Sequence, residues 1–230
     1  MNSSQAGPRH AGAGAGARPR IVVATRSAHK LRELRELLHA ERAQLISLDD
    51  AGVPLDADPV EDGATFAANA RLKARYYARL TGLPTLADDS GLEVDALDGG
   101  PGVRTRRYAG EDATDDTNNA KLLGALAGLP PERRGARYVC VLALADPRPD
   151  ATGPRGAIPI AAETRGTCRG RIATEPRGSG GFGYDPIFEP AGEAPGGRTL
   201  GLWTAAEKNT VSHRSRAARR MAARLARLGY

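Results

Sequence analysis

A short apolar run, a polar turn and an amphipathic stretch follow one another near the start of this chain. Residues 21–24, Ile-Val-Val-Ala, have the length and composition of a buried strand. Residues 25–29 are polar, and the leucines of residues 30–40 recur at a spacing that places them on one face of a helix. A strand, a turn and a helix make half of an α/β unit, so the sequence predicts an α/β fold.

The remaining pattern extends this fold to the end of the chain. Further strands are expected at 45–48, 85–87, 92–94, 136–145 and 160–168, and further helices at 64–80, 115–127 and 211–228. Turns or loops are expected at 88–91, 99–102, 146–158, 178–185 and 190–198. No internal repeat or linker interrupts the pattern, so residues 20–230 are expected to form one domain. Residues 1–19, rich in Ala, Gly and Arg, are expected to be a disordered tail.

Composition excludes several classes of protein. The 230 residues are 40% hydrophobic, and no apolar run approaches the roughly 20 residues that span a bilayer. The N-terminus lacks the apolar segment of a secretory signal, and the two cysteines, Cys140 and Cys168, make neither a disulfide framework nor a zinc site. We therefore expect a cytoplasmic protein without a membrane partner.

The net charge of +6 first suggests a nucleic-acid partner, but its distribution argues against one. Residues 1–20 contribute +3 and residues 207–230 contribute +6, whereas the 186 residues between them carry −3. A nucleic-acid-binding domain is expected to carry its basic stripe on the folded body. The C-terminal arginines are therefore expected to form a solvated helix face, and DNA binding through that helix is the alternative.

The polar turn at residues 25–30 is a candidate anion site. Between a strand and a helix N-terminus, free backbone N–H groups and the helix dipole favour a phosphate. Lys30 stands at the helix start, where a cation is unfavourable for the helix itself, and this points to a ligand. Lys73, which shares a helical face with Asn69, is a candidate for the same phosphate. The alternative for both lysines is an ordinary solvated side chain.

Adjacent carboxylates make a second candidate site. Asp88 and Asp89 stand between apolar segments, where their mutual repulsion would be relieved by a cation such as Mg²⁺. One of them could also orient or deprotonate a water molecule. The alternative is a surface Asx turn. Glu61 and Asp62 precede the second helix, where they could add a metal ligand or simply cap that helix.

Two further segments suit a nucleotide. In residues 178–186, glycines let the backbone approach a ligand, Phe182 offers a stacking surface for a base, and Asp185 can accept hydrogen bonds. The alternative is a tight hairpin with an aromatic plug. Ser212 is a candidate N-cap, which would place His213 and Arg214 in the first turn of the final helix, near a ligand or as a surface pair.

Five stretches carry a resemblance to a known family: IVVATRSAHKLRELRELL, EDGATFAANARLKA, GLPTLADDSGLEVDALDGGPGVRTRRYAGEDATD, GSGGFGYDPIF and EKNTVSHRSRA. In this order they resemble the inosine/xanthosine triphosphate pyrophosphatases, the Ham1-like non-canonical purine NTP pyrophosphatases. The resemblance implies hydrolysis of ITP, dITP and XTP to the monophosphate and pyrophosphate, with Mg²⁺ as cofactor and a homodimer as the assembly. It also implies an elongated α/β fold, in which helices flank a central mixed twisted sheet and two lobes enclose the active-site cleft.

The resemblance further implies roles for individual residues. Asp89 would be the general base, supported by Asp88, and would bind Mg²⁺ together with Glu61. Arg214 as a donor would favour a 6-keto oxygen over the 6-amino group of adenine. The substrate-binding set comprises the phosphate turn (Thr25, Arg26, Ser27, Ala28, His29, Lys30), the triphosphate clamps Lys73 and Lys208, Ser90, the base loop (Phe182, Gly183, Tyr184, Asp185), and the base-edge pair His213 and Arg214.

The chain departs from the family pattern in its first turn. The family usually has Thr-Gly/Asn-Asn there, whereas this chain has Thr25, Arg26 and Ser27, which removes an amide and adds bulk and charge. Extra residues near 146–162 and 190–198 are expected on the surface. A Maf-like nucleotide pyrophosphatase with a different base preference is the remaining enzyme alternative, and the GGFGYDPIF and SHR segments argue against it.

Overall fold

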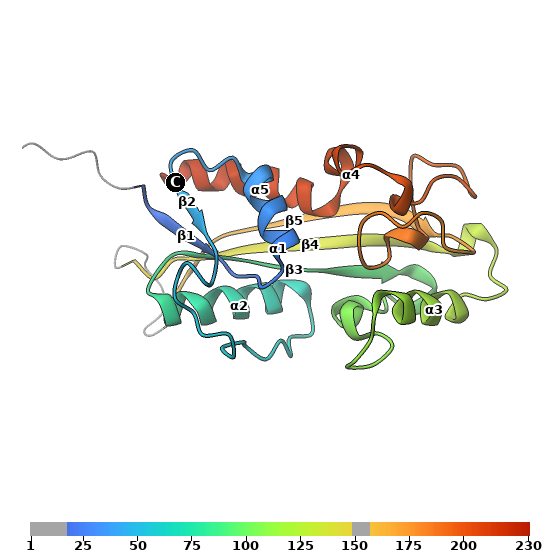
Figure 1. Ribbon diagram of the computed structural model, residues 1–230, viewed down its shortest axis with the longest axis horizontal. Helices are drawn as coiled ribbons and strands as arrows, with labels where there is room; N and C mark the ends of the chain where they lie inside the picture. The colour runs from blue at the N-terminus through green and yellow to red at the C-terminus, as the bar shows by residue number, and fades with distance from the viewer. Residues whose placement is uncertain (1–17, 149–156) are drawn as a thin grey trace, which may run out of the picture.

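Six strands form one mixed sheet in the computed structural model, which describes residues 18–148 and 157–230. The strands are β1 (Arg20–Val23), β2 (Gln44–Ile46), β3 (Thr85–Val94), β4 (Gly135–Ala145), β5 (Ile160–Ile172) and β6 (Phe188–Pro190). Their order is β2-β1-β3-β4-β5-β6, with β1 parallel to β2 and β3 and the other neighbours antiparallel. The three long strands β3, β4 and β5 run along the longest axis of the molecule (Figure 1). The expected α/β fold with a central mixed sheet is confirmed.

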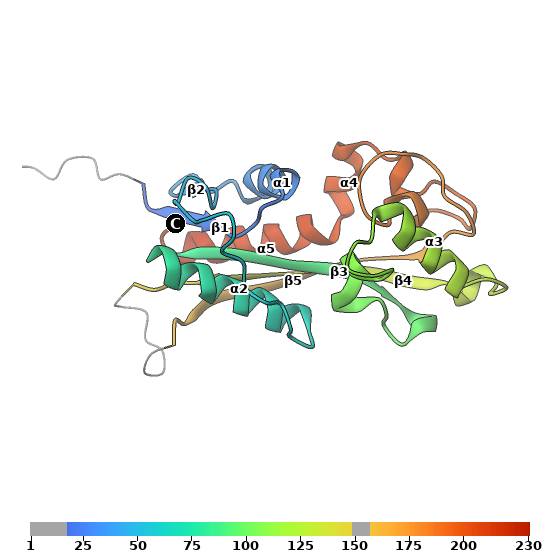
Figure 2. The same ribbon diagram turned by 60° about the horizontal axis from the view of Figure 1, so that its bottom comes forward.

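Helices cover both faces of this sheet. They are α1 (Ala28–Leu38), α2 (Phe66–Thr81), α3 (Asp115–Ala125), α4 (Ala205–Val211) and α5 (His213–Arg227). Figure 2 shows α2 below the long strands and α1, α4 and α5 above them, whereas α3 lies at the far end of the sheet, level with β4. Short polar side chains cap the N-termini, as Ser27 does for α1 and Thr65 for α2. No helix among the described residues is long and apolar enough to cross a membrane.

Side chains alternate along β4, so its apolar residues contribute to separate clusters on the two faces of the sheet. Cys140 and Leu142 pack with α1 and α5, whereas Val139 and Val141 pack with α2. Both sides of β4 are buried, which explains why its sequence reads as a continuous apolar run. A third apolar cluster at the far end joins α3 to β3, β4 and the segment around Phe188. Both cysteines are buried and unpaired.

The turn expected at residues 88–91 is wrong. These residues lie inside β3, and each pairs with a β4 residue between Val139 and Leu142. Asp-Asp-Ser-Gly is a turn sequence by local propensity, but the long-range ladder to β4 overrides that preference. The two strands expected on either side of the turn are therefore one strand.

The end of the chain agrees with the sequence in part. The helix expected at 211–228 is α5, and Ser212 caps it as predicted, by accepting the backbone N–H of Ser215 at 3.1 Å, but the pattern did not indicate α4 before it. Strand β5 continues to Ile172 and pairs there with β6, a strand that the pattern did not indicate. The predicted tail, residues 1–19, and the predicted loop at 146–158 lie largely outside the described residues.

Helix α5 lies directly against β5. A Cβ atom at Gly166 would stand 2.0 Å from the carbonyl oxygen of His213, so only glycine allows this approach. Thr164 donates from Oγ1 to the carbonyl of Ala217 at 3.0 Å. Arg216 and Arg220 are exposed, as expected, but they donate to the carbonyls of Thr167 and Arg165 on β5. This contact fixes the start of α5 relative to the sheet.

Candidate active site

The two adjacent aspartates of β3 point to opposite faces of the sheet, because side chains alternate along a strand. Asp88 shares the α1 and α5 face with Leu86, and Asp89 shares the α2 face with Ala87. Strand β1 pairs with β3 only through Thr85 and Leu86. Beyond that point the edge of β3 is left to the turn after β1 and to the surrounding helices. The candidate site wraps around this edge.

Asp88 is buried among cations. Its Oδ2 atom lies 3.0 Å from Lys30 Nζ and 3.5 Å from Arg214 Nη2. Burial opposes ionisation of this carboxyl, but Lys30, Arg214 and Lys73 together outweigh burial, so the pKa of Asp88 lies well below its usual value. Asp88 is therefore a permanent anion that holds the surrounding cations in place.

Arg214 is the largest fully buried side chain of the described residues, with 1% of its surface exposed. Its Nη1 atom lies 2.8 Å from Glu33 Oε2, and its Nη2 atom donates to Ser90 Oγ at 3.2 Å. Burial disfavours the cation, but Asp88 and Glu33 more than compensate and raise its pKa. The Nε atom is buried and has no hydrogen-bond partner among the described residues. One donor of the guanidinium is thus buried without a hydrogen bond.

Asp89 has the opposite surroundings. Its Oδ2 atom is buried without a hydrogen-bond partner among the described residues. Burial, together with the negative charges of Glu61 and Asp88, raises the pKa of Asp89 to about 6, although Lys73 and a hydrogen bond with Asn69 act in the other direction. With a pKa of about 6, this carboxyl changes its charge at a pH just below neutral, which suits a group that takes up and releases a proton.

Lys73 stands between the two aspartates. Its ammonium lies 2.8 Å from Glu61 Oε1 and donates to the backbone carbonyl of Asp88 at 3.1 Å. Burial alone would lower the pKa of Lys73, but Asp88 and Glu61 raise it, so the side chain is charged. Among the predicted residues, Lys73, Glu61 and Asp89 are thus brought together on the α2 face.

Glu61 and Asp89 fit the implied Mg²⁺. The unpartnered Oδ2 of Asp89 and the repulsion between the two carboxylates are both features that a cation would relieve. Mg²⁺ is usually held by one or two carboxylates, with water and substrate phosphates completing its octahedron. Among the described residues, no group of three His, Cys, Asp or Glu side chains is placed to hold a metal ion.

The predicted phosphate turn is an open helix N-terminus. Ser27 caps α1 by accepting the N–H of Lys30 at 3.3 Å, and Thr25 Oγ1 accepts the N–H of Ser27 at 3.1 Å. Ala28 and His29 are exposed, and Lys30 reaches from the turn to Asp88. Arg26 differs from the expectation, because its guanidinium turns away from this group and contacts Asp49 and the carbonyl of Pro54.

Phe182 is exposed to 40% and faces the phosphate turn. Its ring lies edge-on to His29, with 4.9 Å between the ring centroids. The ammonium of Lys208 and the guanidinium of Arg214 lie 5.3 and 5.8 Å from the centre of the same ring. The exposed aromatic surface is therefore bordered by cations from both helices of the C-terminal pair.

The other members of the base loop hold it in shape. Asp185 is buried, accepts the N–H of Phe182 at 2.9 Å and pairs with Lys208 at 2.5 Å. Gly183 donates to Asp115 at 2.6 Å and accepts from Asn119 at 3.1 Å, so α3 supports the loop. The ring of Tyr184 is buried, and its hydroxyl donates to the carbonyl of Thr105 at 2.8 Å. The side chain of Tyr184 thus has a packing role here, in contrast to the exposed ring of Phe182.

His213 stacks on Tyr138, with 4.8 Å between the ring centroids and 10° between the ring planes. Burial and the nearby charges of Arg214 and Lys208 hold the pKa of His213 well below its usual value. The imidazole is therefore neutral at physiological pH. Tyr138 also approaches Asp185, so His213 and the base loop are positioned by the same side chain.

Sequence reasoning missed several residues of this arrangement. Glu33 follows Lys30 by one helical turn, and that spacing could have indicated that both reach the same place. Asp115, Asn119 and Tyr138 support the base loop from α3 and β4. No local pattern distinguishes these three from ordinary helix or strand residues, because their partners lie far away in the chain.

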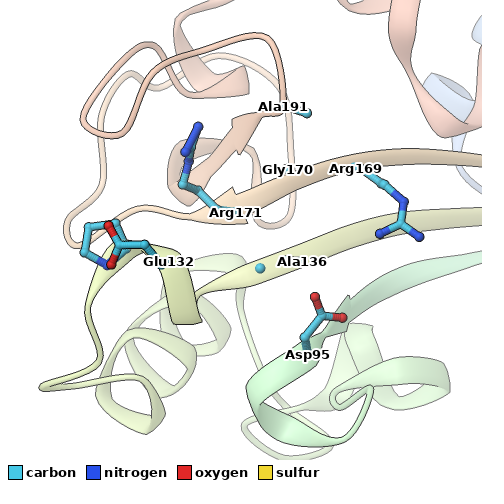
Figure 3. Close-up of a pocket in the computed structure, with 9 residues that line it drawn as sticks. Asp95, Glu132, Ala136, Arg169, Gly170, Arg171 and Ala191 are labelled. Carbon is cyan, nitrogen blue, oxygen red and sulfur yellow. The ribbon is translucent and has the colours of Figure 1, made fainter.

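A separate hollow of about 350 Å³ lies at the far end of the sheet. Figure 3 shows Asp95 and Glu132 with Arg169 and Arg171 around it. None of its lining residues belongs to the candidate site. The mixed charges of its wall indicate no single class of ligand.

Cations gathered around a carboxylate-bearing strand edge define a class, the α/β enzymes that act on phosphorylated substrates. The model of the Ham1 family matches residues 21–224, and the chain belongs to the Ham1 family.

Two relatives and two solved structures illustrate the likeness. The chain is 44% identical over 235 residues to a dITP/XTP pyrophosphatase of Anaeromyxobacter sp. (strain Fw109-5), covering 90% of this chain and 97% of the relative. It is 45% identical over 198 residues to the dITP/XTP pyrophosphatase of Shigella flexneri, covering 86% and 93%. A HAM1 protein from Coxiella burnetii has a TM-score of 0.78 at 40% identity, covering 91% of this chain and 99% of that one. A nucleoside-triphosphatase / dITP/XTP pyrophosphatase from Mycobacterium abscessus has a TM-score of 0.69 at 43% identity, covering 88% and 98%.

Proposed function

We propose that this protein hydrolyses non-canonical purine nucleoside triphosphates, namely ITP, dITP and XTP, to the monophosphate and pyrophosphate. The names of its relatives support this substrate class. Hydrolysis of a phosphoanhydride needs charge neutralisation and an oriented water more than covalent catalysis. The cations and carboxylates around the edge of β3 are suited to both tasks.

The surroundings of Asp89 are the observation that carries the proposal. Its unpartnered oxygen and its pKa of about 6 suit a general base. Asp89 takes a proton from water, the resulting hydroxyl oxygen bonds to the α-phosphorus, and the bond from that phosphorus to the bridging oxygen breaks. The electron pair leaves with pyrophosphate.

Lysines from three helices hold the triphosphate in this proposal. Lys30 of α1 and Lys73 of α2 contact Asp88 of β3, whereas Lys208 of α4 pairs with Asp185 and lies over the ring of Phe182 in the base loop. The N-terminus of α1 adds backbone N–H groups to the same site. When Mg²⁺ is bound by Glu61 and Asp89, it supplies further positive charge to the phosphates.

The purine stacks on the exposed face of Phe182. Arg214 is assigned as the donor to the 6-keto oxygen, which adenine lacks. His213 is neutral and lies next to this arginine, so it can present either a donor or an acceptor to the base edge. Discrimination against adenine then comes from Arg214, which cannot accept a hydrogen bond from a 6-amino group.

Four further properties belong to this proposal. The protein is a homodimer and acts in the cytoplasm. Residues 20–230 act as one domain, which the continuous strands β3, β4 and β5 support. The enzyme does not act on nucleic acid, and the engagement of Arg216 and Arg220 with β5 carbonyls supports this exclusion.

Pyrophosphate release from dITP, XTP, dATP and dGTP, each measured with Mg²⁺ and with EDTA, tests the function. We expect rapid, Mg²⁺-dependent release from dITP and XTP only. Comparable release from all four substrates would contradict the role of Arg214, and release from none would contradict the hydrolase itself.

A further inference from the structure

Arg26 fastens the phosphate turn to a distant loop. Its Nη1 atom lies 3.2 Å from Asp49 Oδ1, and its Nη2 atom donates to the carbonyls of Pro54 at 2.5 Å and Ala57 at 3.4 Å. The side chain of Arg26 is about a quarter exposed, at 26%, although the turn itself is open. One guanidinium thus binds three groups of the segment 49–57.

The same segment is held by α2 on its other side. Tyr77 donates from its hydroxyl to the carbonyl of Ala57 at 3.0 Å and also contacts the carboxylate of Asp58. Ala57 therefore accepts from both Arg26 and Tyr77. Glu61 lies four residues after Ala57, before α2 begins. Its carboxylate pairs with Lys73 of α2, the helix that also carries Tyr77. The segment between the two anchors leads directly to the carboxylate that faces Asp89.

We propose that Arg26 is a positioning residue, which fixes the segment 54–61 against the phosphate turn and so holds Glu61 in place for a divalent cation. The inference rests on the proposed function, because it assigns Arg26 a task in the metal site of that enzyme. It replaces the direct phosphate contact that the sequence suggested for this side chain. Arg26, which departs from the family pattern, thus connects the phosphate turn to the segment that precedes Glu61.

The guanidinium is suited to this task by its shape. Its planar fork carries five N–H donors in fixed directions, so it can bind a carboxylate and two carbonyls at once. A lysine at this position keeps the charge but is a point donor and cannot reproduce the fork. The contacts lie at the surface, and their effect is therefore on local order more than on global stability.

The test compares Arg26→Ala and Arg26→Lys with the matched control Arg35→Ala. Arg35 lies on α1, the helix that follows the phosphate turn, and contacts the carbonyl of Leu45 and the carboxylate of Asp50; none of its described contacts is with residues 54–61. Two measurements need no turnover: Mn²⁺ affinity by water-proton relaxation, and hydrogen exchange of the peptide that covers residues 54–61. The Mg²⁺ dependence of dITP hydrolysis is measured alongside them.

We expect Arg26→Ala to weaken Mn²⁺ binding by about tenfold and to speed exchange across residues 54–61. The Mg²⁺ concentration for half-maximal activity rises by the same factor. Arg26→Lys recovers part of the loss, and Arg35→Ala leaves Mn²⁺ affinity unchanged.

Wild-type Mn²⁺ affinity and wild-type exchange in Arg26→Ala would overturn the inference. An equal loss of affinity in Arg35→Ala would also overturn it, since that result would mean general loosening of α1. Failure of the proposed function looks different, because the wild-type protein would then release no pyrophosphate whatever residue 26 is.

Discussion

The two faces of β3 hold one aspartate each and treat it in opposite ways. On the α1 and α5 face, Asp88 meets Lys30 and Arg214, and cations outnumber carboxylates around it. On the α2 face, Asp89 meets Glu61 and keeps one buried oxygen without a partner among the described residues. One peptide bond separates a carboxyl with a depressed pKa from a carboxyl with a raised pKa. Strand alternation alone creates this difference, because it directs neighbours into different surroundings.

The comparison assigns different tasks to the two carboxylates. A fully paired anion fixes its cationic neighbours, whereas an unpartnered carboxyl near its titration point can bind a cation and exchange a proton. We therefore expect substitutions that look alike to have different consequences on the two faces.

The largest expected effect is on turnover. Asp89→Asn removes the proposed base, and we expect kcat for dITP to fall by about 10²- to 10⁴-fold while the circular dichroism spectrum stays native. Asp89→Glu serves as a control that keeps the acid but moves it. Near-normal turnover in Asp89→Asn would mean that another group accepts the proton.

The same substitution on the two faces should shift stability in opposite directions. A depressed carboxyl pKa stabilises the fold above the usual value of 3.8, so Asp88→Asn should cost about 3 kcal/mol at pH 7 by leaving buried cations uncompensated. A raised pKa costs stability above about pH 6, so Asp89→Asn should gain about 2 kcal/mol in metal-free protein at pH 8. Urea unfolding at both pH values measures this. Two shifts of the same sign would refute the contrast.

The contrast also predicts the pH profile. Asp89 must be ionised to act as a base, so kcat/KM at limiting Mg²⁺ should fall about tenfold per pH unit below about pH 6. Asp88 remains ionised across this pH range, so it should add no second decrease to the pH profile of kcat/KM. Rates of dITP hydrolysis between pH 4.5 and 8.5 test this, with a far-UV signal at each pH to confirm folding. A profile that stays flat down to pH 5 would contradict the raised pKa.

The smallest expected effect tests how much Glu61 contributes to the raised pKa of Asp89. The charge of Glu61 raises the pKa of Asp89, so Glu61→Gln should lower it, and the gain in stability from Asp89→Asn at pH 8 should shrink in that background. A double-mutant cycle in metal-free protein, followed by urea unfolding, measures the coupling. Glu41→Gln, a change at an exposed carboxylate on the connection between α1 and β2, is the control. Full additivity of Glu61→Gln and Asp89→Asn would show that the charge of Glu61 does not contribute to the shift.

Much of the fold could be predicted because its signals are local. The apolar run before Lys30 predicts β1, the Thr81-Gly82 ending predicts the end of α2, and Gly82 indeed adopts the left-handed conformation there. The strand through Asp88–Gly91 could not be predicted in this way. Its sequence favours a turn, and only the ladder to β4, some fifty residues later, makes it extended.

The site divides along the same line. Residues of the motifs, such as Lys30, Lys73 and Asp89, were identified, and the structure brings them to one strand edge. The residues that contact them could not be identified from the sequence. Glu33 and Asn119 are recognisable only from the contacts they make across the fold, and the direction of the Arg26 side chain depends on a loop that begins some twenty residues later.

The close approach at Gly166 links the proposed base-edge pair to a residue on a neighbouring strand. Any side chain there would push the start of α5 outward, and that start carries both His213 and Arg214. Among natural variants, a change at this position would resemble a packing defect in a remote strand. Under the proposed function its signature would nevertheless be lost discrimination between bases, since the lysines proposed to bind the phosphates lie on other helices. Position 166 thus acts as a spacer between β5 and the helix that carries the proposed base-edge pair.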